Sequence, residues 1–195
     1  MVMNDDMRTH KNIKNSNQDS SIISHKMPPN DKTTPPNTIP YTIREAQAAD
    51  IAECYEIESA SYPEDEAATL EKLKLRQSEA QPFFRICCIR PNSDDEEEEV
   101  IVGFICATLC KEFSEESMSV HDASGDLLAI HSVVVREEYR RQKYATKMLL
   151  NYVSYIREVH SSVRKLVLIA KQHLLRFYVH CGFRVLGLSD IEHGE

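Results

Sequence analysis

Apolar residues between positions 41 and 188 recur in short blocks, separated by polar loops. The blocks are rich in β-branched and aromatic side chains, which is typical of strands. We expect strands at Tyr41–Arg44, Phe83–Arg90, Val100–Lys111, Leu127–Val135, Lys165–Ala170 and Phe183–Leu188. Because Leu127–Val135 is almost entirely apolar, the pattern predicts that this strand is buried on both faces.

Helical periodicity occurs in several of the segments between these expected strands. The clearest case is an amphipathic stripe at helical spacing, formed by Ala145, Met148, Leu149, Tyr152, Val153 and Ile156. Shorter helices are expected over 50–59, 66–77 and 174–181, the second with Leu70, Leu73 and Leu75 turned inward and the third closed by Gly182. The series of strands and helices after residue 127 predicts an α/β fold whose sheet is partly parallel, with crossover helices.

Two segments lack apolar periodicity. Residues 1–38 are rich in Asn, Ser, Thr and Pro, so we expect a disordered tail over 1–40 and one folded domain over 41–195. Residues 92–99 (NSDDEEEE) are a charge run that predicts a solvated hairpin loop between two antiparallel strands. A regulatory or partner-binding role of this acidic loop stays open.

Charge narrows the choice of partners. The chain of 195 residues carries a net charge of −8, and its first 40 residues hold five basic and four acidic side chains. The remaining 18 basic and 27 acidic residues give the folded domain a net charge of −9. Such a domain repels nucleic acids and anionic membranes and attracts cations. The sequence therefore favours a small cationic partner, although acidity that only keeps the protein soluble is an equal alternative.

The remaining composition points to a cytoplasmic protein. No apolar run approaches the roughly 20 residues of a membrane span, and the polar N-terminus offers no secretory signal. Six cysteines occur without any CxxC pair, so zinc ribbons and thioredoxin-like motifs have no support. We expect no metal and interpret most of these cysteines as small buried hydrophobic residues.

Candidate chemistry begins where the strand Leu127–Val135 leads through a basic turn into the long helix. The turn contains Arg140, Arg141, Gln142 and Lys143. Unpaired backbone N–H groups at a helix start attract anions, and the added basic side chains suit a diphosphate. A basic surface turn without a ligand is the alternative.

Three ordered motifs carry a family resemblance. YRRQKYATKMLL resembles the cofactor motif [Q/R]-x-x-G-x-[G/A] of the Gcn5-related N-acetyltransferases (GNAT). LLAIHSVVV resembles the strand before that motif, and HLLRFYVHCGFRVLG resembles the strand–helix–strand end of the family's domain. The resemblance covers about Tyr41 to the C-terminus and is closest to the arylalkylamine and polyamine branch. It implies a mixed central sheet flanked by helices.

The resemblance also implies site residues. Acetyl-CoA would pair its pantetheine with the strand backbone and place its pyrophosphate at the start of the following helix. The implied contacts are Val133, Val134, Val135, Arg140, Arg141, Gln142, Lys143, Tyr144, Ala145 and Thr146. His131 matches the second of two catalytic-type histidines, as proton acceptor or relay, and Tyr178 matches the general acid. The alternatives are a core histidine and a packing tyrosine.

The chain departs from the family pattern at three places. Ala129 stands where the first catalytic-type histidine is expected, so the two-histidine relay is incomplete. Lys143 replaces the motif's glycine, which permits close backbone approach to phosphate. The chain ends soon after Phe183–Leu188, so we expect the sheet to lack its last strand. That edge would be unpaired or covered by another chain.

The amine site is predicted between the first two helices, at Tyr62 and Pro63, with Ile169 on a neighbouring strand. The acidic residues beside Pro63 suit an ammonium group, or they only complement a helix dipole. We predict acetyl-CoA-dependent N-acetylation of a small primary amine, either an arylalkylamine or a polyamine. The alternatives are a protein or peptide N-acetyltransferase of the same fold and a degenerate protein that only binds acetyl-CoA.

Overall fold

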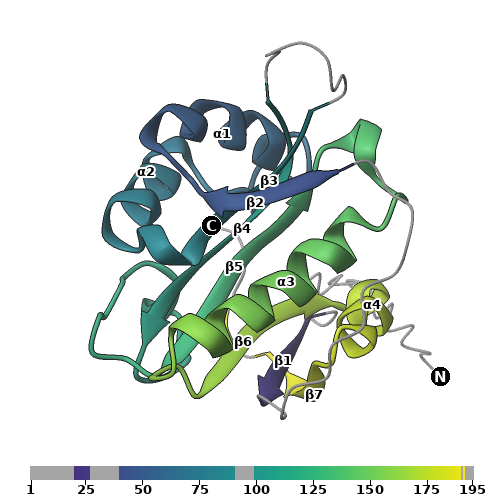
Figure 1. Ribbon diagram of the computed structural model, residues 1–195. Coiled ribbons are helices and arrows are strands. Elements are labelled where there is room, and N and C mark those ends of the chain that lie inside the picture. Colours follow the sequence, from purple (N-terminus) through teal and green to yellow (C-terminus); the bar gives the residue numbers. More distant parts are fainter. Residues whose placement is uncertain (1–19, 27–39, 91–98, 190, 192–195) are drawn as a thin grey trace, which may run out of the picture.

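A seven-stranded sheet organises the protein. The computed structural model (Figure 1) describes residues 20–26, 40–90, 99–189 and 191. The strands are β1 (Ser20–Lys26), β2 (Tyr41–Glu45), β3 (Phe84–Ile89), β4 (Val100–Cys110), β5 (Leu127–Val135), β6 (Lys165–Lys171) and β7 (Arg184–Leu188). They lie in the order β2-β3-β4-β5-β6-β1-β7, in which only β5 and β6 pair in parallel.

Two pairs of helices cover the two faces of this sheet (Figure 1). On one face, α1 (Ile51–Ser59) and α2 (Leu70–Glu79) bury their apolar side chains against Phe84 and Phe104. On the other face, α3 (Tyr144–Val159) and α4 (Leu175–His180) pack on the larger core. Short 3₁₀ turns link the elements: η1 (Ala48–Asp50), η2 (Gln81–Phe83), η3 (Glu116–Met118), η4 (Glu137–Tyr139) and η5 (Gln172–Leu174). None of the described helices is both long and apolar enough to cross a membrane.

The longest predicted helix and the predicted cysteine environment are confirmed. α3 buries Met148, Leu149, Tyr152, Val153 and Ile156, so its apolar stripe faces the sheet. All six cysteines are free and buried. Gly182, after α4, has a φ of 89°, the left-handed value expected of a helix-ending glycine.

The second helix begins later than its periodicity suggested. Thr69 caps it, because its hydroxyl accepts a hydrogen bond from the backbone N–H of Lys72 at 3.2 Å. α2 therefore runs from Leu70 to Glu79 instead of 66–77. Leu73 is fully buried as predicted, whereas the prediction that Leu75 turns inward is wrong, since it is 43% exposed. The Arg76 side chain, buried beside Cys106, faces the sheet instead.

Part of the predicted disordered tail is a strand. β1 pairs along its whole length with β6, from Ser20 opposite Lys171 to Lys26 opposite Lys165. Its Ile23 is fully buried in the main core. The prediction of disorder is therefore wrong for residues 20–26, because a segment with two apolar residues in seven becomes a strand through pairing on both edges. Residues 1–19 and 27–39 lie outside the described part of the chain, as does most of the acidic loop 92–99.

The expectation that the sheet lacks its last strand is also wrong. β7 is present, and β1 lies between β6 and β7, antiparallel to both, with the purple β1 beside the yellow β7 in Figure 1. The N-terminal segment thus lies between the two strands of the sheet that are last in the chain. The outer edge of β7 has no strand partner among the described residues, so the predicted pairing of this edge with another chain stays a prediction.

Candidate functional site

The central strands β5 and β6 separate after a short parallel ladder. Their pairing covers only Leu127, Leu128 and Ala129, opposite Lys165, Leu166 and Val167. Beyond Ala129, β6 continues along β1, and within the described ranges no strand pairs with that edge of β5. Val133, Val134 and Val135 lie on this stretch. Arg140 Nε already donates to the Val135 carbonyl, and the rest of this backbone edge faces no described strand, as an extended ligand requires.

A β-bulge shapes the same strand at its centre. Cys106 of β4 pairs with Ser132 and Ala107 pairs with Ile130, which leaves His131 as the extra residue. The bulge interrupts the alternation of side chains. His131 contacts Thr108 and Ser132 contacts Glu58 of α1, so two consecutive polar side chains face the α1–α2 side. An unbroken strand would have turned one of them toward α3.

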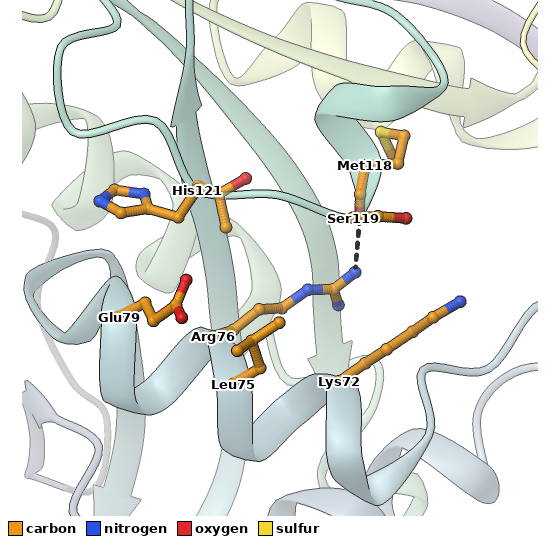
Figure 2. A pocket seen from close by; sticks show the side chains of 8 residues that line it. Lys72, Leu75, Arg76, Glu79, Met118, Ser119 and His121 are labelled. Atoms are coloured by element: carbon orange, nitrogen blue, oxygen red, sulfur yellow. Dashed lines mark hydrogen bonds between the residues drawn. The ribbon is translucent and has the colours of Figure 1, made fainter.

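His131 is held by a hydroxyl group. Its Nε2 lies 2.7 Å from Thr108 Oγ1. Thr108 also lines a hollow of about 30 Å³ between α2, β4 and the η3 turn. Figure 2 shows the side chains that line this hollow from α2 and from residues 118–121. At that size the hollow holds one or two water molecules but not an amine substrate. It therefore suits the exchange of a proton with solvent and does not suit substrate binding.

The predicted anion loop has a left-handed backbone at two of its residues. Arg141 and Lys143 have φ values of 64° and 65°, in the left-handed region that favours glycine. Lys143 is the N-cap of α3, and no side chain caps the helix there. The first backbone N–H groups of α3 have no partners within the helix, so they are available to an anion.

The side chains of this loop have different surroundings. Arg140 donates from Nε to the carbonyl of Val135 at 3.0 Å and from Nη2 to Ser61 Oγ at 3.0 Å. Gln142 donates to the carbonyl of Glu138. Tyr144 is buried and packs edge-on against two other tyrosines, Tyr41 and Tyr139. Arg140 therefore anchors the loop to the end of β5, while Tyr144 offers its backbone rather than its ring to a ligand.

Two predicted site tyrosines come from opposite faces of the sheet, Tyr178 from α4 and Tyr62 from the segment after α1. Tyr178 of α4 is 7% exposed and packs against Phe177 and Phe183. Burial raises the pKa of Tyr178 well above its usual range, so the phenol is protonated at neutral pH. Tyr62 follows α1, and burial also raises the pKa of its phenol. The neighbouring Glu58 and Tyr178 raise it further, and a hydrogen bond with the Val133 backbone opposes them.

Pro63 and Ile169 are the other two predicted substrate residues. Pro63 is exposed, and its carbonyl accepts the backbone N–H groups of Glu66 and Ala67, so it shapes the turn after α1. Ile169 of β6 is partly buried opposite Ile22 of β1. Lys171 of β6 forms an ion pair with Glu66 at 2.7 Å, which ties this turn to the strand. The ion pair thus holds the turn after α1 beside β6. Pro63 supports this turn through its backbone carbonyl.

Sequence reasoning overlooked Glu58. This carboxyl group is 2% exposed on the last turn of α1, and its Oε1 accepts hydrogen bonds from Ser132 Oγ at 2.9 Å and Ala68 N at 3.1 Å. Burial raises its pKa. The available signal was its helical spacing from Ile51 and Cys54, which places an acidic residue on the apolar stripe of α1.

Comparison with known proteins supports the resemblance in the motifs. Residues 51–183 match the acetyltransferase (GNAT) family. A serotonin N-acetyltransferase from Mesocricetus auratus is 28% identical over 101 residues, which cover 51% of this chain and 48% of that protein. The chain thus matches about half the length of this curated relative.

Solved structures show the same fold. A Gcn5-related N-acetyltransferase from Sphaerobacter thermophilus has a TM-score of 0.57 at 20% identity, covering 87% of this chain and 49% of its own. A GNAT-like decarboxylase, GphF, in complex with isobutyryl-CoA has a TM-score of 0.50 at 19% identity, covering 60% and 59%. Since the family match spans more than half of the 195 residues, the chain belongs to the acetyltransferase (GNAT) family.

Proposed function

We propose that this protein transfers the acetyl group of acetyl-CoA to a small primary amine, an arylalkylamine or a polyamine. The observation that carries the proposal is the edge of β5 beyond Ala129, which no described strand pairs, with His131 beside it on the bulge. The left-handed loop that begins α3 lies at the end of the same strand. Together they offer sites for an extended pantetheine, a thioester and a diphosphate.

The cofactor would bind along β5 and end at α3. The backbone of Val133 to Val135 would pair with the amide groups of the pantetheine, as an added strand does. The N–H groups from Arg141 to Thr146 would hold the pyrophosphate, with Arg140 fixing the loop. Because Tyr62 shares a hydrogen bond with the Val133 backbone, pantetheine and Tyr62 would compete for that group. The family relative GphF was solved with an acyl-CoA, which supports an acyl-CoA ligand here.

The reaction requires two proton movements. A primary alkylamine has a pKa near 10, so it arrives protonated and must lose one proton before its nitrogen can attack. The nitrogen then forms a C–N bond with the acetyl carbonyl, the C–S bond breaks, and the nitrogen loses a second proton. His131 would accept or relay a proton, and Thr108 with its hollow would connect it to solvent. Tyr178 would donate a hydrogen bond or proton to the departing thiolate.

The choice of substrate rests on charge and relatives. The acidic folded domain favours a cation, and Tyr62 offers an aromatic face beside an acidic turn. The match to serotonin N-acetyltransferase supports an arylalkylamine, while the acidic surroundings suit a polyamine equally well.

Release of free CoA thiol in the presence of an amine panel tests the proposal. The panel contains tryptamine, phenethylamine, spermidine and a peptide with a free N-terminus, each with acetyl-CoA. We expect thiol release and the acetylated product with at least one small amine. Preference for the peptide, or acetyl-CoA binding without turnover, would contradict the proposal.

Two variants test the proposed acid and base. His131→Gln and Tyr178→Phe should each lower turnover about 100-fold, as loss of a general acid or base does, with acetyl-CoA affinity preserved. His180→Gln and Tyr55→Phe are matched controls, because both side chains are exposed. Unchanged turnover in both test variants would remove the assigned roles.

A further inference from the structure

A carboxyl group beside the proposed reaction site is buried, and it forms no ion pair with any cationic side chain that the structure describes. Glu58 is 2% exposed, and its Oε1 already accepts two hydrogen bonds, from Ser132 and Ala68. Its Oε2 is buried and has no hydrogen-bond partner among the residues that the structure describes. An unpaired carboxylate oxygen in a protein interior is costly, so its retention points to a ligand group that binds there.

Arg76, a cationic side chain that acts on Glu58, donates its described hydrogen bonds to other groups. The Arg76 guanidinium lies close enough to lower the pKa of Glu58 in part. However, its Nη1 contacts Cys106 Sγ at 3.8 Å and its Nη2 donates to the Met118 carbonyl at 3.3 Å, as Figure 2 shows for Met118. No described ion pair joins Arg76 to Glu58. The free oxygen can therefore accept a hydrogen bond from an incoming cation.

The position of Glu58 links it to the reacting atoms. Ser132, which donates to it, lies between His131 and Val133 on β5 and turns toward α1 because of the bulge. Tyr62, four residues after Glu58, is near enough to Glu58 and to Tyr178 for both to raise the pKa of its phenol. Glu58 therefore lies beside the β5 backbone where the thioester would sit, on the side of the predicted amine site.

We propose that Glu58 is a further catalytic residue, which binds the ammonium group of the substrate through Oε2 and accepts its first proton. The inference rests on the proposed N-acetyltransferase function and names a group for the amine half of that reaction. It also supplies a second proton acceptor in a chain where Ala129 replaces one of the two family histidines.

The proton balance is simple. The pair R–NH₃⁺ and Glu58–COO⁻ becomes R–NH₂ and Glu58–COOH, and the neutral amine then uses its lone pair to attack the thioester carbonyl. The proton lost from nitrogen after attack goes through His131 to the CoA thiolate, and Glu58–COOH loses its proton to solvent when the products leave, which restores the carboxylate. Burial, which raises the pKa of Glu58, makes its carboxylate a better base near neutral pH.

The test pairs one substitution with two substrates. Glu58→Gln keeps an oxygen that accepts from Ser132 and Ala68 but removes the charge and the basic oxygen. With phenethylamine, kcat/KM should fall about 100-fold. With β,β-difluorophenethylamine, whose fluorines lower its basicity so that much of it is already neutral, the loss should be under about five-fold. Equal losses with both amines, or no loss with either, would overturn the proposal.

Controls separate this inference from the proposed function and from a structural role. Glu56→Gln changes an exposed glutamate on the same helix and should leave kinetics unchanged. Thermal unfolding and acetyl-CoA titration of Glu58→Gln establish that fold and cofactor binding persist. If the wild-type protein acetylates no amine, the proposed function fails. If it acetylates phenethylamine and Glu58→Gln does so equally well, only the role of Glu58 fails. Should Glu58→Gln unfold, Glu58→Met, which removes the carboxylate at nearly the same side-chain length, must show the same amine-dependent loss.

Discussion

Lys143 combines a left-handed backbone with a bulky side chain at the start of α3. A φ of 65° costs a side-chain-bearing residue about 1 kcal/mol, and the position matches the glycine of the family's motif. Lys143→Gly should therefore tighten acetyl-CoA binding roughly two- to ten-fold, because it removes a Cβ at the proposed phosphate site. Calorimetric titration measures this, and weaker binding in the glycine variant would contradict it. Lys143→Ala is the control that removes the charge and keeps the strain.

The Thr108 hydroxyl contacts the His131 ring, with its Oγ1 2.7 Å from Nε2. Loss of one hydrogen bond of about 1 kcal/mol corresponds to a roughly five-fold change. Thr108→Val, which keeps the shape and removes the hydroxyl, should lower kcat about five-fold without changing acetyl-CoA affinity. Steady-state kinetics across pH 6–9 measure the effect, with the exposed Thr42→Val as control. Equal rates at every pH would exclude a role of this hydroxyl.

At the scale of elements, β1 is the least expected part of the sheet. Ile23 is fully buried, while its neighbour Ile22 is partly exposed. Ile23→Ala should lower the free energy of unfolding by about 2–4 kcal/mol, because it leaves a cavity in the main core. Ile22→Ala should cost clearly less. Urea unfolding of both variants measures the difference, and similar small effects would show that β1 contributes little.

β1 also introduces a pH dependence through His25. This side chain is buried against Phe183, and burial, with nearby Arg157, lowers its pKa below 6.5. Below pH ~6.5, His25 therefore binds a proton in the unfolded chain but not in the folded chain. The free energy of unfolding decreases as the pH falls toward the folded-state pKa. Unfolding curves at pH 8 and 5.5 should show a larger decrease for the wild type than for His25→Gln. The exposed His180→Gln should behave like the wild type.

The elements of the fold differ in whether their sequence patterns predicted them. The α3 stripe and the apolar β5 were predictable, because burial of one face or two imposes a periodicity on local sequence. β1 (SSIISHK) was not, because its seven residues carry no such pattern and depend on the edges of β6 and β7. The sequence did not indicate the β5 bulge either, because the register of two strands is a non-local property.

At the scale of the whole molecule, the net charge of −8 should influence substrate capture. Attraction of a cationic amine to an acidic protein is screened by salt. KM for phenethylamine should therefore rise about two- to five-fold between 20 and 200 mM NaCl, while KM for the less basic difluoro analogue should change less. Initial rates at both salt concentrations test this, and identical salt dependence for the two amines would contradict it.

The amino-acid sequence by itself determined the family, the order of most strands and helices, and the candidate residues His131, Tyr178 and Lys143. It did so because motifs, periodicity and turn residues are local properties of the chain. Only the tertiary structure decided that β1 completes the sheet, that β5 parts from β6 after Ala129, and that Glu58 lies buried beside Ser132. These features arise from pairing and packing between segments far apart in the chain, which no local pattern records.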